Sequence, residues 1–394
     1  MAIRTGAQLT IVAISVIGAL VPFTPARAAD KRAAEYLVYI GTYTRDDSQG
    51  IYVCSFDTNT GELGPPRVAA SAADTKIKNP SFLAIPPGGQ RLYAVSEVDD
   101  HPAPGGGAVA AFSIGADAAL TLLNHQPSAG AGPCHLSLDR DGRTALVANY
   151  GSGSVASLPI GSDGKLAAPV STMQHEGSSV NRQRQEAPHA HSINLDPKNR
   201  FALAADLGTD EVVSYRFNAQ SGALEQNDAG TFKTPAGAGP RHLAFHPNGR
   251  WVYVNGELIS TIMALDYNDQ NGSLVLRQQV STLPEDVDAS QNTTAEVQVH
   301  PNGKTLYVSN RGHDSIAMFA IDAEEGSLRP LGYHPTGGHT PRNFGIDPTG
   351  AWLVAANQDS GTVTVHRISD DGTLSATERQ AAIPWPVCVK FLAR

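Results

Sequence analysis

The strongest constraint on the fold is a repeated unit that recurs along nearly the whole chain. In its clearest copy, residues 239–257 read GPRHLAFHPNGRWVYVNGE, which is a Gly-Pro pair, an apolar segment, a His-Pro-Asn-Gly turn and a second apolar segment. A third segment with alternating apolar residues, 261–267, follows before a Gly-Ser-Leu turn. Short runs rich in β-branched and aromatic residues, bounded by Pro, Asn and Gly, predict strands and turns rather than helices. Each unit is therefore expected to form a small antiparallel sheet.

Six copies of the unit align on one residue of the turn after the first strand. These turn residues are Gly89, Gly142, Asn199, Gly249, Gly303 and Gly350. They lie roughly 50 residues apart, a period typical of propeller blades. The third strand of each copy is expected to contain, in order, Ser113, Ser157, Ser214, Ala264, Met318 and Val365. A fourth, outer strand is expected after it.

The two chain ends supply a seventh unit. Residues 36–41 and 50–56 have the pattern of a second and third strand without a first, and residues 384–391 have the pattern of a first strand. Joining them closes a ring with no free sheet edge. We therefore predict an all-β fold, a seven-bladed β-propeller formed as one domain by residues 29–394, with its ring closed by the C-terminal strand in the N-terminal blade. Separate β domains are the alternative, but no segment has the composition of a linker.

Residues 1–28 have the pattern of a secretory signal peptide rather than of a part of the fold. Arg4 precedes an apolar run at 9–20, and Ala26-Arg27-Ala28 fits a cleavage site. The run is short for a membrane span, although an uncleaved anchor remains the alternative. We expect a periplasmic or secreted protein that has no membrane association after cleavage.

The composition argues against several classes of partner. A net charge of -9 at pH 7 leaves no general basic surface of the kind that nucleic-acid-binding proteins carry. The three cysteines, Cys54, Cys134 and Cys388, have no metal-ligand spacing, and their odd number is compatible with one disulfide or with buried thiols. We expect no metal, no cofactor and no nucleic acid, and we expect a monomer.

Positions at the strand ends differ in type from copy to copy. In a propeller the innermost strand lines the central channel, so equivalent residues should surround it at similar depth. Strand interiors repeat Val, Leu, Ala and Ile, whereas these positions carry different polar residues, which favours one asymmetric pocket on a symmetric scaffold. Solvated loop ends would also be polar. The members that we select as candidates are Glu97, His135, His191, Arg241, Glu257, Arg311, Arg342 and Gln358.

A polar insertion at 172–187 interrupts the repeat just before His189-Ala-His191. We expect it to form a lid or rim loop that brings Asn181, Arg182 or Arg184 over the channel, although a plain solvent-exposed loop is the simpler alternative. Two histidines at i and i+2 of a strand share one face, but without other ligands they make a poor metal site.

The chain resembles the lactonase family of seven-bladed propellers, which includes propeller-type 6-phosphogluconolactonases and carboxymuconate lactonizing (cyclase) enzymes. The resemblance rests on the segment 239–257, on PHAHS and YVSNRG, and on PRNF with AANQDS, and it runs from Tyr36 to Leu392. It implies catalytic roles for His191, Arg241, Glu257 and Arg311. It also implies that Arg342 and Gln358 occupy recurrent family positions, and we expect both to bind substrate together with Glu97, His135 and Arg182.

Lactone opening needs an activated water, stabilisation of an oxyanion and a proton for the leaving alkoxide. Either Glu257 or His191 could be the base, and arginines could hold an anionic substrate. We therefore expect a 6-phosphogluconolactonase-like hydrolase that acts on a small anionic lactone or carboxylate. A muconate-type cycloisomerase and a non-enzymatic binding propeller are the alternatives. An enzyme would bring the four catalytic candidates together, whereas a binding scaffold would scatter them.

Overall fold

The computed structural model describes residues 1–2, 35–100 and 106–394 of the 394-residue chain. All of the described strands belong to one compact unit, Ala33–Arg394. Beyond its first two residues, the predicted signal peptide lies outside the described residues. Within the described ranges, no helix is both long enough and apolar enough to cross a membrane.

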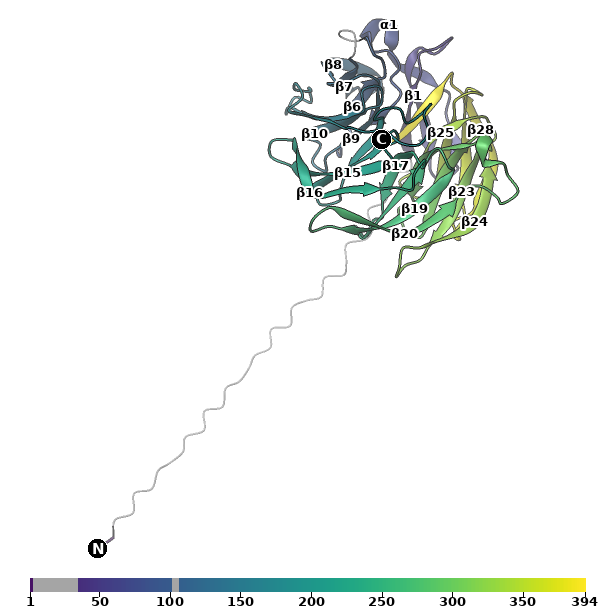
Figure 1. Cartoon of the computed structure of the whole chain (residues 1–394). Helices are drawn as coiled ribbons and strands as arrows, with labels where there is room; N and C mark the ends of the chain where they lie inside the picture. The colour runs from purple at the N-terminus through teal and green to yellow at the C-terminus, as the bar shows by residue number, and fades with distance from the viewer. Residues whose placement is uncertain (3–34, 101–105) are drawn as a thin grey trace. The chain divides into compact units, whose positions relative to one another are not determined.

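The unit 33–394 consists of seven β-sheets that follow one another along the chain (Figure 1). Six sheets have four antiparallel strands each, and in every one the strands pair in the order in which they follow one another along the chain. Their strands are β5 (Leu83–Ala84), β6 (Arg91–Ser96), β7 (Ala108–Ile114) and β8 (Leu120–Pro127); β9 (Pro133–Leu138), β10 (Thr144–Asn149), β11 (Ser154–Pro159) and β12 (Ser171–Gln174); β13 (Ala190–Leu195), β14 (Phe201–Asp206), β15 (Glu211–Asn218) and β16 (Ala223–Lys233); β17 (Pro240–Phe245), β18 (Trp251–Gly256), β19 (Thr261–Asn268) and β20 (Ser273–Ser281); β21 (Thr293–Val299), β22 (Thr305–Arg311), β23 (Ser315–Ile321) and β24 (Leu328–Pro335); and β25 (Pro341–Ile346), β26 (Trp352–Asn357), β27 (Thr362–Ile368) and β28 (Leu374–Ala382).

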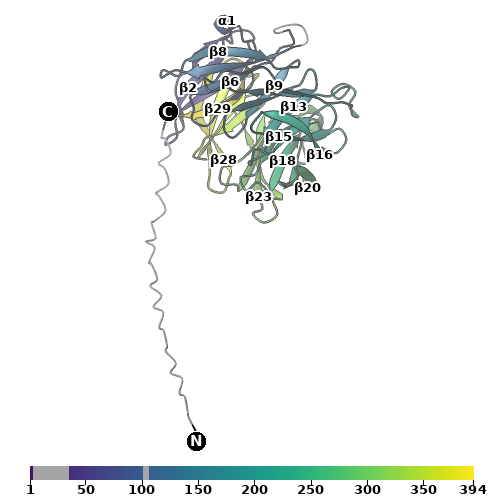
Figure 2. The same cartoon turned by 90° about the vertical axis from the view of Figure 1, so that its left-hand side faces the viewer.

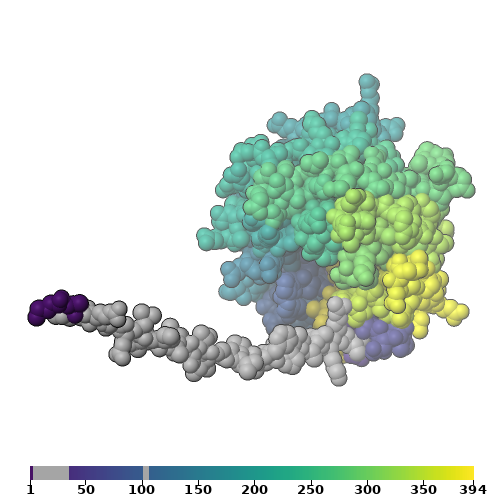
Figure 3. All heavy atoms as spheres, turned by 90° about the horizontal axis from the view of Figure 1, so that it is seen from below, coloured from purple at the N-terminus to yellow at the C-terminus, as the bar shows by residue number. Residues whose placement is uncertain are grey.

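The seventh sheet joins the two chain ends. Its strands are β29 (Pro386–Ala393), β1 (Glu35–Thr42), β2 (Gly50–Asp57), β3 (Glu62–Leu63) and β4 (Arg67–Ser71). Strand β29 pairs antiparallel with β1 from Tyr36↔Ala393 to Thr42↔Pro386. Yellow C-terminal atoms accordingly lie beside the purple N-terminal blade (Figure 3), and β29 lies in the same blade as β2 (Figure 2). The predicted seven-bladed propeller and its mode of closure are confirmed.

The blades pack face to face, so their middle strands are buried on both sides. Strands β10, β14, β18 and β26 have no exposed residue. Four equivalent tyrosines also connect neighbouring blades, because each hydroxyl donates to a turn carbonyl of the next blade at 2.9–3.0 Å; the donors are Tyr39, Tyr93, Tyr253 and Tyr307. Such buried hydroxyls need a partner, and these bonds fix the blade-to-blade register.

The histidines of two blade turns, His246 and His300, have a structural role. Nε2 of His246 lies 2.8 Å from the carbonyl oxygen of Gly303, and His300 makes the same contact with Gly350. Both are buried between adjacent turns rather than on the outside, because each turn packs on the next one. The three cysteines are free and buried. Beyond the strands, the described residues form the short helix α1 (Ala72–Thr75) and the 3-10 helix η1 (Ala289–Gln291).

Candidate active site

One mouth of the central channel contains a polar cavity of about 210 Å³. Its walls come from the first residues of inner strands, the ends of second strands and the insertion at 172–187. The lining residues are Glu97, Cys134, Tyr150, Arg184, His191, Glu257, Arg311 and Arg342. Positions that were far apart in the sequence but equivalent in the repeat therefore meet in one place.

Glu257 is the centre of an arginine cluster. Its Oε2 lies 2.9 Å from Nε of Arg241 and 3.0 Å from Nη2 of Arg311. Nη2 of Arg184, which the insertion supplies, donates to Oε1 at 2.7 Å. The Glu257 side chain is only 3% exposed. One buried carboxylate thus organises three cations from three separate segments.

Backbone carbonyls fix two of these arginines. Nη1 of Arg241 donates to the carbonyl oxygen of Ala295 at 2.7 Å, and Nη2 of Arg311 donates to that of Thr294 at 2.9 Å. Both acceptors belong to β21, so a neighbouring strand determines where the guanidinium groups lie. Preorganised donors of this kind need little rearrangement when negative charge develops near them.

The cluster determines the protonation state of its carboxylate. Burial by itself would raise the pKa of Glu257, but Arg311, Arg241 and Arg184 outweigh it and lower the pKa to about 2. Burial, together with the nearby charges of Arg311 and Arg342, lowers the pKa of Arg241 to about 9 in spite of Glu257. At neutral pH the cavity therefore contains an ionised carboxylate among guanidinium groups.

His191 is a buried, neutral imidazole on the wall of the cavity. Its Nδ1 lies 3.6 Å from Sγ of Cys134, and its ring meets those of Tyr150 and His242 edge to face at 5.3 Å each. Burial, followed by the charge of Arg241, lowers its pKa well below the ordinary value. The ring is thus available as a proton acceptor at neutral pH.

Glu97 and Arg342 form another wall. Tyr43 Oη donates to both Glu97 oxygens at 3.0 and 3.1 Å, and Ser81 Oγ also contacts the carboxylate. Burial raises the pKa of Glu97 although Arg342 opposes the change. The Arg342 guanidinium stacks 5.4 Å from the centre of the Tyr43 ring. It has no hydrogen bond or ion pair with any residue that the structure describes, so its donors are free for a ligand.

The insertion behaves as the predicted rim loop, and Arg184 is the residue that it brings to the cavity. Nδ1 of His175 contacts Asp206 at 2.6 Å, and Asp210 accepts bonds from Ser179 at 2.6 Å and from Gln185 at 2.7 Å. Two aspartates at the end of one blade therefore anchor the loop at both of its ends.

Three predicted substrate-binding residues do not line this cavity. Arg182 is exposed on the same loop and makes no hydrogen bond or ion pair with the described residues. Gln358 donates to the neighbouring Asp359 at 2.8 Å. His135 lies deeper along its strand and faces the opposite end of the channel. Tyr43 was missed, because its blade has no turn glycine on which the repeat can be aligned.

A search of the described residues finds no group of three or more His, Cys, Asp or Glu side chains that could hold a metal ion. The cavity offers instead guanidinium, imidazole and carboxyl groups. Together they can bind an anion, accept a proton and donate one.

Comparison with known proteins agrees with this geometry. Residues 37–391 match the family model described as "Lactonase, 7-bladed beta-propeller". The chain is 38% identical over 361 residues to a 6-phosphogluconolactonase of Bacillus subtilis, a match that covers 91% of this chain and 99% of the relative. It is 34% identical over 339 residues to a 6-phosphogluconolactonase of Formosa agariphila, covering 84% and 92% of the two chains.

A solved structure shares both sequence and fold. The periplasmic gluconolactonase of Pseudomonas aeruginosa superposes with a TM-score of 0.83 at 31% identity, covering 91% of this chain and 99% of that one. Because the family model covers nearly all of the described propeller, the assignment concerns the whole domain rather than one motif. The chain belongs to the seven-bladed β-propeller lactonase family.

Proposed function

We propose that the protein is a lactone hydrolase that opens a sugar or carboxylate lactone in the Glu257 cavity. The observation that carries the proposal is the convergence of three arginines on Glu257 in a cavity that also contains His191 and Arg342, which has no ion pair among the described residues. Family membership supports it, because relatives over the full domain are named lactonases. A binding scaffold would not require this convergence of four predicted catalytic residues.

In the proposed reaction, water attacks the lactone carbonyl carbon and the ring C–O bond breaks. The carbonyl oxygen gains negative charge in the transition state, and guanidinium donors at the mouth of the cavity stabilise it. Arg342 suits this role because its donors have no partner among the described residues, and Arg311 lines the same cavity. The product is an open-chain hydroxy acid in its carboxylate form.

His191 is the better candidate for the base that takes the proton from water. Arginines already hold both oxygens of the Glu257 carboxylate, Arg184 at Oε1 and Arg241 with Arg311 at Oε2, so neither oxygen is free to take a proton from water. His191 is neutral and has a ring nitrogen able to accept a proton. In this assignment Glu257 positions the arginines and does not itself transfer a proton.

Glu97 is the proposed proton donor to the leaving ring oxygen. Its environment raises its pKa, whereas that of Glu257 lowers it, and both carboxyl groups line the same cavity. Two carboxyl groups whose pKa values are pushed apart are a common arrangement for separate acid and electrostatic roles. Tyr43 and Ser81 would stabilise the carboxylate that remains after the transfer.

We also propose that the protein is exported and that its substrate is a lactone present outside the cytoplasm. The signal-peptide pattern of residues 1–28 supports export, and the structural relative from Pseudomonas aeruginosa is named as periplasmic. Cell fractionation followed by N-terminal sequencing tests this point, with Ala29 as the expected first residue. Retention of residues 1–28 on the purified protein would contradict it.

The experiment that tests the activity is a pH-stat assay of the purified mature protein. Gluconolactone, 6-phosphogluconolactone and a muconolactone would be compared, and lactone formation from the open acids would be measured with the same samples. Glu257→Gln and Arg241→Ala should abolish turnover. Arg277→Ala, which removes an exposed ion pair with Asp266 far from the cavity, is the matched control and should not.

Two results would contradict the proposal. One is the absence of turnover on every lactone by a folded protein, and the other is turnover that neither cavity substitution changes. Because loss of a buried ion pair can also unfold a protein, circular dichroism must accompany each assay. Arg342→Gln provides a second cavity variant, in which no ion pair among the described residues is lost.

A further inference from the structure

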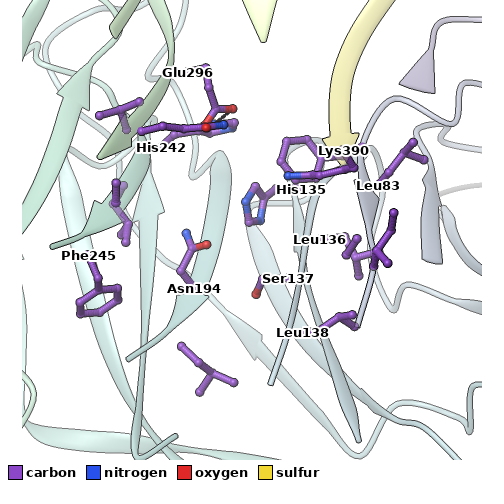
Figure 4. Close-up of a pocket in the computed structure, with 18 of the residues that line it drawn as sticks. Leu83, His135, Leu136, Ser137, Leu138, Asn194, His242, Phe245, Glu296 and Lys390 are labelled. Carbon is purple, nitrogen blue, oxygen red and sulfur yellow. Dashed lines mark hydrogen bonds and ion pairs between the residues drawn. The ribbon is translucent and has the colours of Figure 1, made fainter. Parts of the chain in front are cut away.

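The opposite end of the channel contains a second and larger cavity, of about 580 Å³. The inner strands run from one cavity to the other: Arg241 at the start of β17 reaches the catalytic cluster, whereas Phe245 at its end lines the second cavity. Figure 4 shows its labelled residues arranged around an open centre. A volume of this size suits a small organic ligand.

A packed layer separates the two cavities. Between them remains a space of about 10 Å³, bordered by side chains that include Phe82, His242 and Asn343. That volume is at the lower limit for one water molecule. A ligand in the second cavity would therefore not be the lactone bound in the first.

His135 presents an uncommitted hydrogen-bond donor to the second cavity. Its ring is 5% exposed, and the backbone N–H of Ile193 donates to its Nδ1 at 3.3 Å. Burial, followed by the charges of His242 and Lys390, lowers its pKa well below the ordinary value, so the ring is neutral. The single ring proton is then on Nε2, which has no partner among the described residues.

Further free donors lie around the same space. The Lys390 ammonium group lies 4.7 Å from the centre of the Phe82 ring and has no ion pair within the described part of the chain. The side-chain amide of Asn194 likewise has no hydrogen bond to a described residue, and it lies across the open centre from His135 in Figure 4.

The acidic groups of the cavity are already occupied. Glu296 accepts from Nδ1 of His242 at 3.1 Å and from the amide of Asn343. Asp139 accepts from the backbone N–H groups of Arg143 and Thr144. Donors are therefore in excess over acceptors, and an anion satisfies them best.

The remaining wall is apolar. Leu83 and Leu136 are buried in the fold and border the cavity together with Phe245. We propose that this second cavity binds a small monocarboxylate with an apolar body, its carboxylate directed at Lys390, His135 and Asn194. Lys390 and the exposed Arg140 are the cations of this cavity that have no ion pair among the described residues, and with the two neutral donors they suit a small carboxylate.

The proposal is tested by titrating benzoate into the full mature protein and measuring binding by calorimetry and by saturation-transfer NMR. Benzyl alcohol, which has the same ring without the charge, is the comparison ligand. We expect saturable binding of benzoate in the millimolar range, about tenfold tighter than benzyl alcohol. Lys390→Gln should weaken benzoate binding about tenfold, since it removes a charge-assisted contact.

Matched variants separate the site from general charge effects. Lys304→Gln removes the same charge from an exposed turn outside the cavity and should leave benzoate binding unchanged. Asn194→Ala should weaken it with no loss of an existing hydrogen bond. Equal affinity for the two ligands, or benzoate binding that Lys390→Gln leaves unchanged, would overturn the proposal. Because binding is read without any lactone, the outcome does not depend on whether the proposed hydrolase activity is found.

Discussion

Replacing Glu257 by glutamine should destabilise the protein strongly, and the size of the effect follows from its arginine contacts. The fall in pKa from the ordinary 4.5 to about 2 corresponds to about 3 kcal/mol of stability at neutral pH, at about 1.4 kcal/mol for each pH unit. Removing one partner of a buried ion pair costs about 3–5 kcal/mol, which agrees. Glu257→Gln should therefore lower the free energy of unfolding by about 3 kcal/mol at pH 7.

The same reasoning fixes the pH dependence. Because the carboxyl pKa is lower in the folded state, its contribution is complete above about pH 4.5 and is lost as the pH falls toward 2. The difference in the free energy of unfolding between wild type and Glu257→Gln should therefore be smaller at pH 3 than at pH 7, by about 2 kcal/mol. Urea denaturation followed by circular dichroism at the two pH values measures both quantities.

A surface pair provides the control. Glu211 lies 3.6 Å from Lys233, whose side chain is 81% exposed, and Glu211→Gln should change the free energy of unfolding by less than about 1 kcal/mol. A Glu257→Gln protein within about 1 kcal/mol of the wild type at pH 7 would refute the reasoning. It would mean that the three arginines do not depend on the carboxylate for their charge balance.

Three further changes separate the roles of the cavity residues. Arg342→Gln should leave the melting temperature unchanged but lower kcat/KM by about 100-fold, as loss of an oxyanion donor does; an unchanged kcat/KM would exclude that role. Glu97→Gln should remove the fall in kcat that occurs as the pH rises through the raised pKa of Glu97, and a pH profile that keeps this fall would remove Glu97 as the proton donor. Asp210→Asn should loosen the loop 175–186, measured as faster proteolysis within it, and raise KM because Arg184 is less well placed; resistance to protease equal to the wild type would contradict this anchoring.

Most of the fold was predictable because the repeat restricts it at several levels at once. The turn glycines set the register, the alternation sets the strands, and the unmatched strands at the chain ends require ring closure. The antiparallel pairing of β29 with β1 meets that requirement. The repeat could not show how far its turns are buried: His246 and His300 lie in turns, and only the packing of one turn on the next buries them.

The candidate site was predictable to the extent that it follows the repeat. Glu257, Arg311 and His191 came from equivalent positions and line one cavity. His135 is only one residue further along its strand than Cys134, but alternation of side chains turns it toward the second cavity. The insertion has no counterpart in the repeat, so the sequence alone could not show whether Arg182 or Arg184 reaches the cavity. That depends on how Asp210 anchors the loop.

The two ends of the channel are separate cavities, yet a continuous line of polar contacts passes through the layer between them. Arg241 lies against Glu257 at one end and donates toward Nε2 of His242 at 3.3 Å, and Nδ1 of His242 contacts Glu296 at the other end. The tautomer is consistent throughout, because a neutral His242 that accepts at Nε2 must donate at Nδ1. Whether each group in the line donates or accepts depends on its neighbour. A change at Glu296 therefore alters whether Nε2 of His242 can accept a hydrogen bond from Arg241. The position of Arg241 is therefore determined partly from the far side of the propeller.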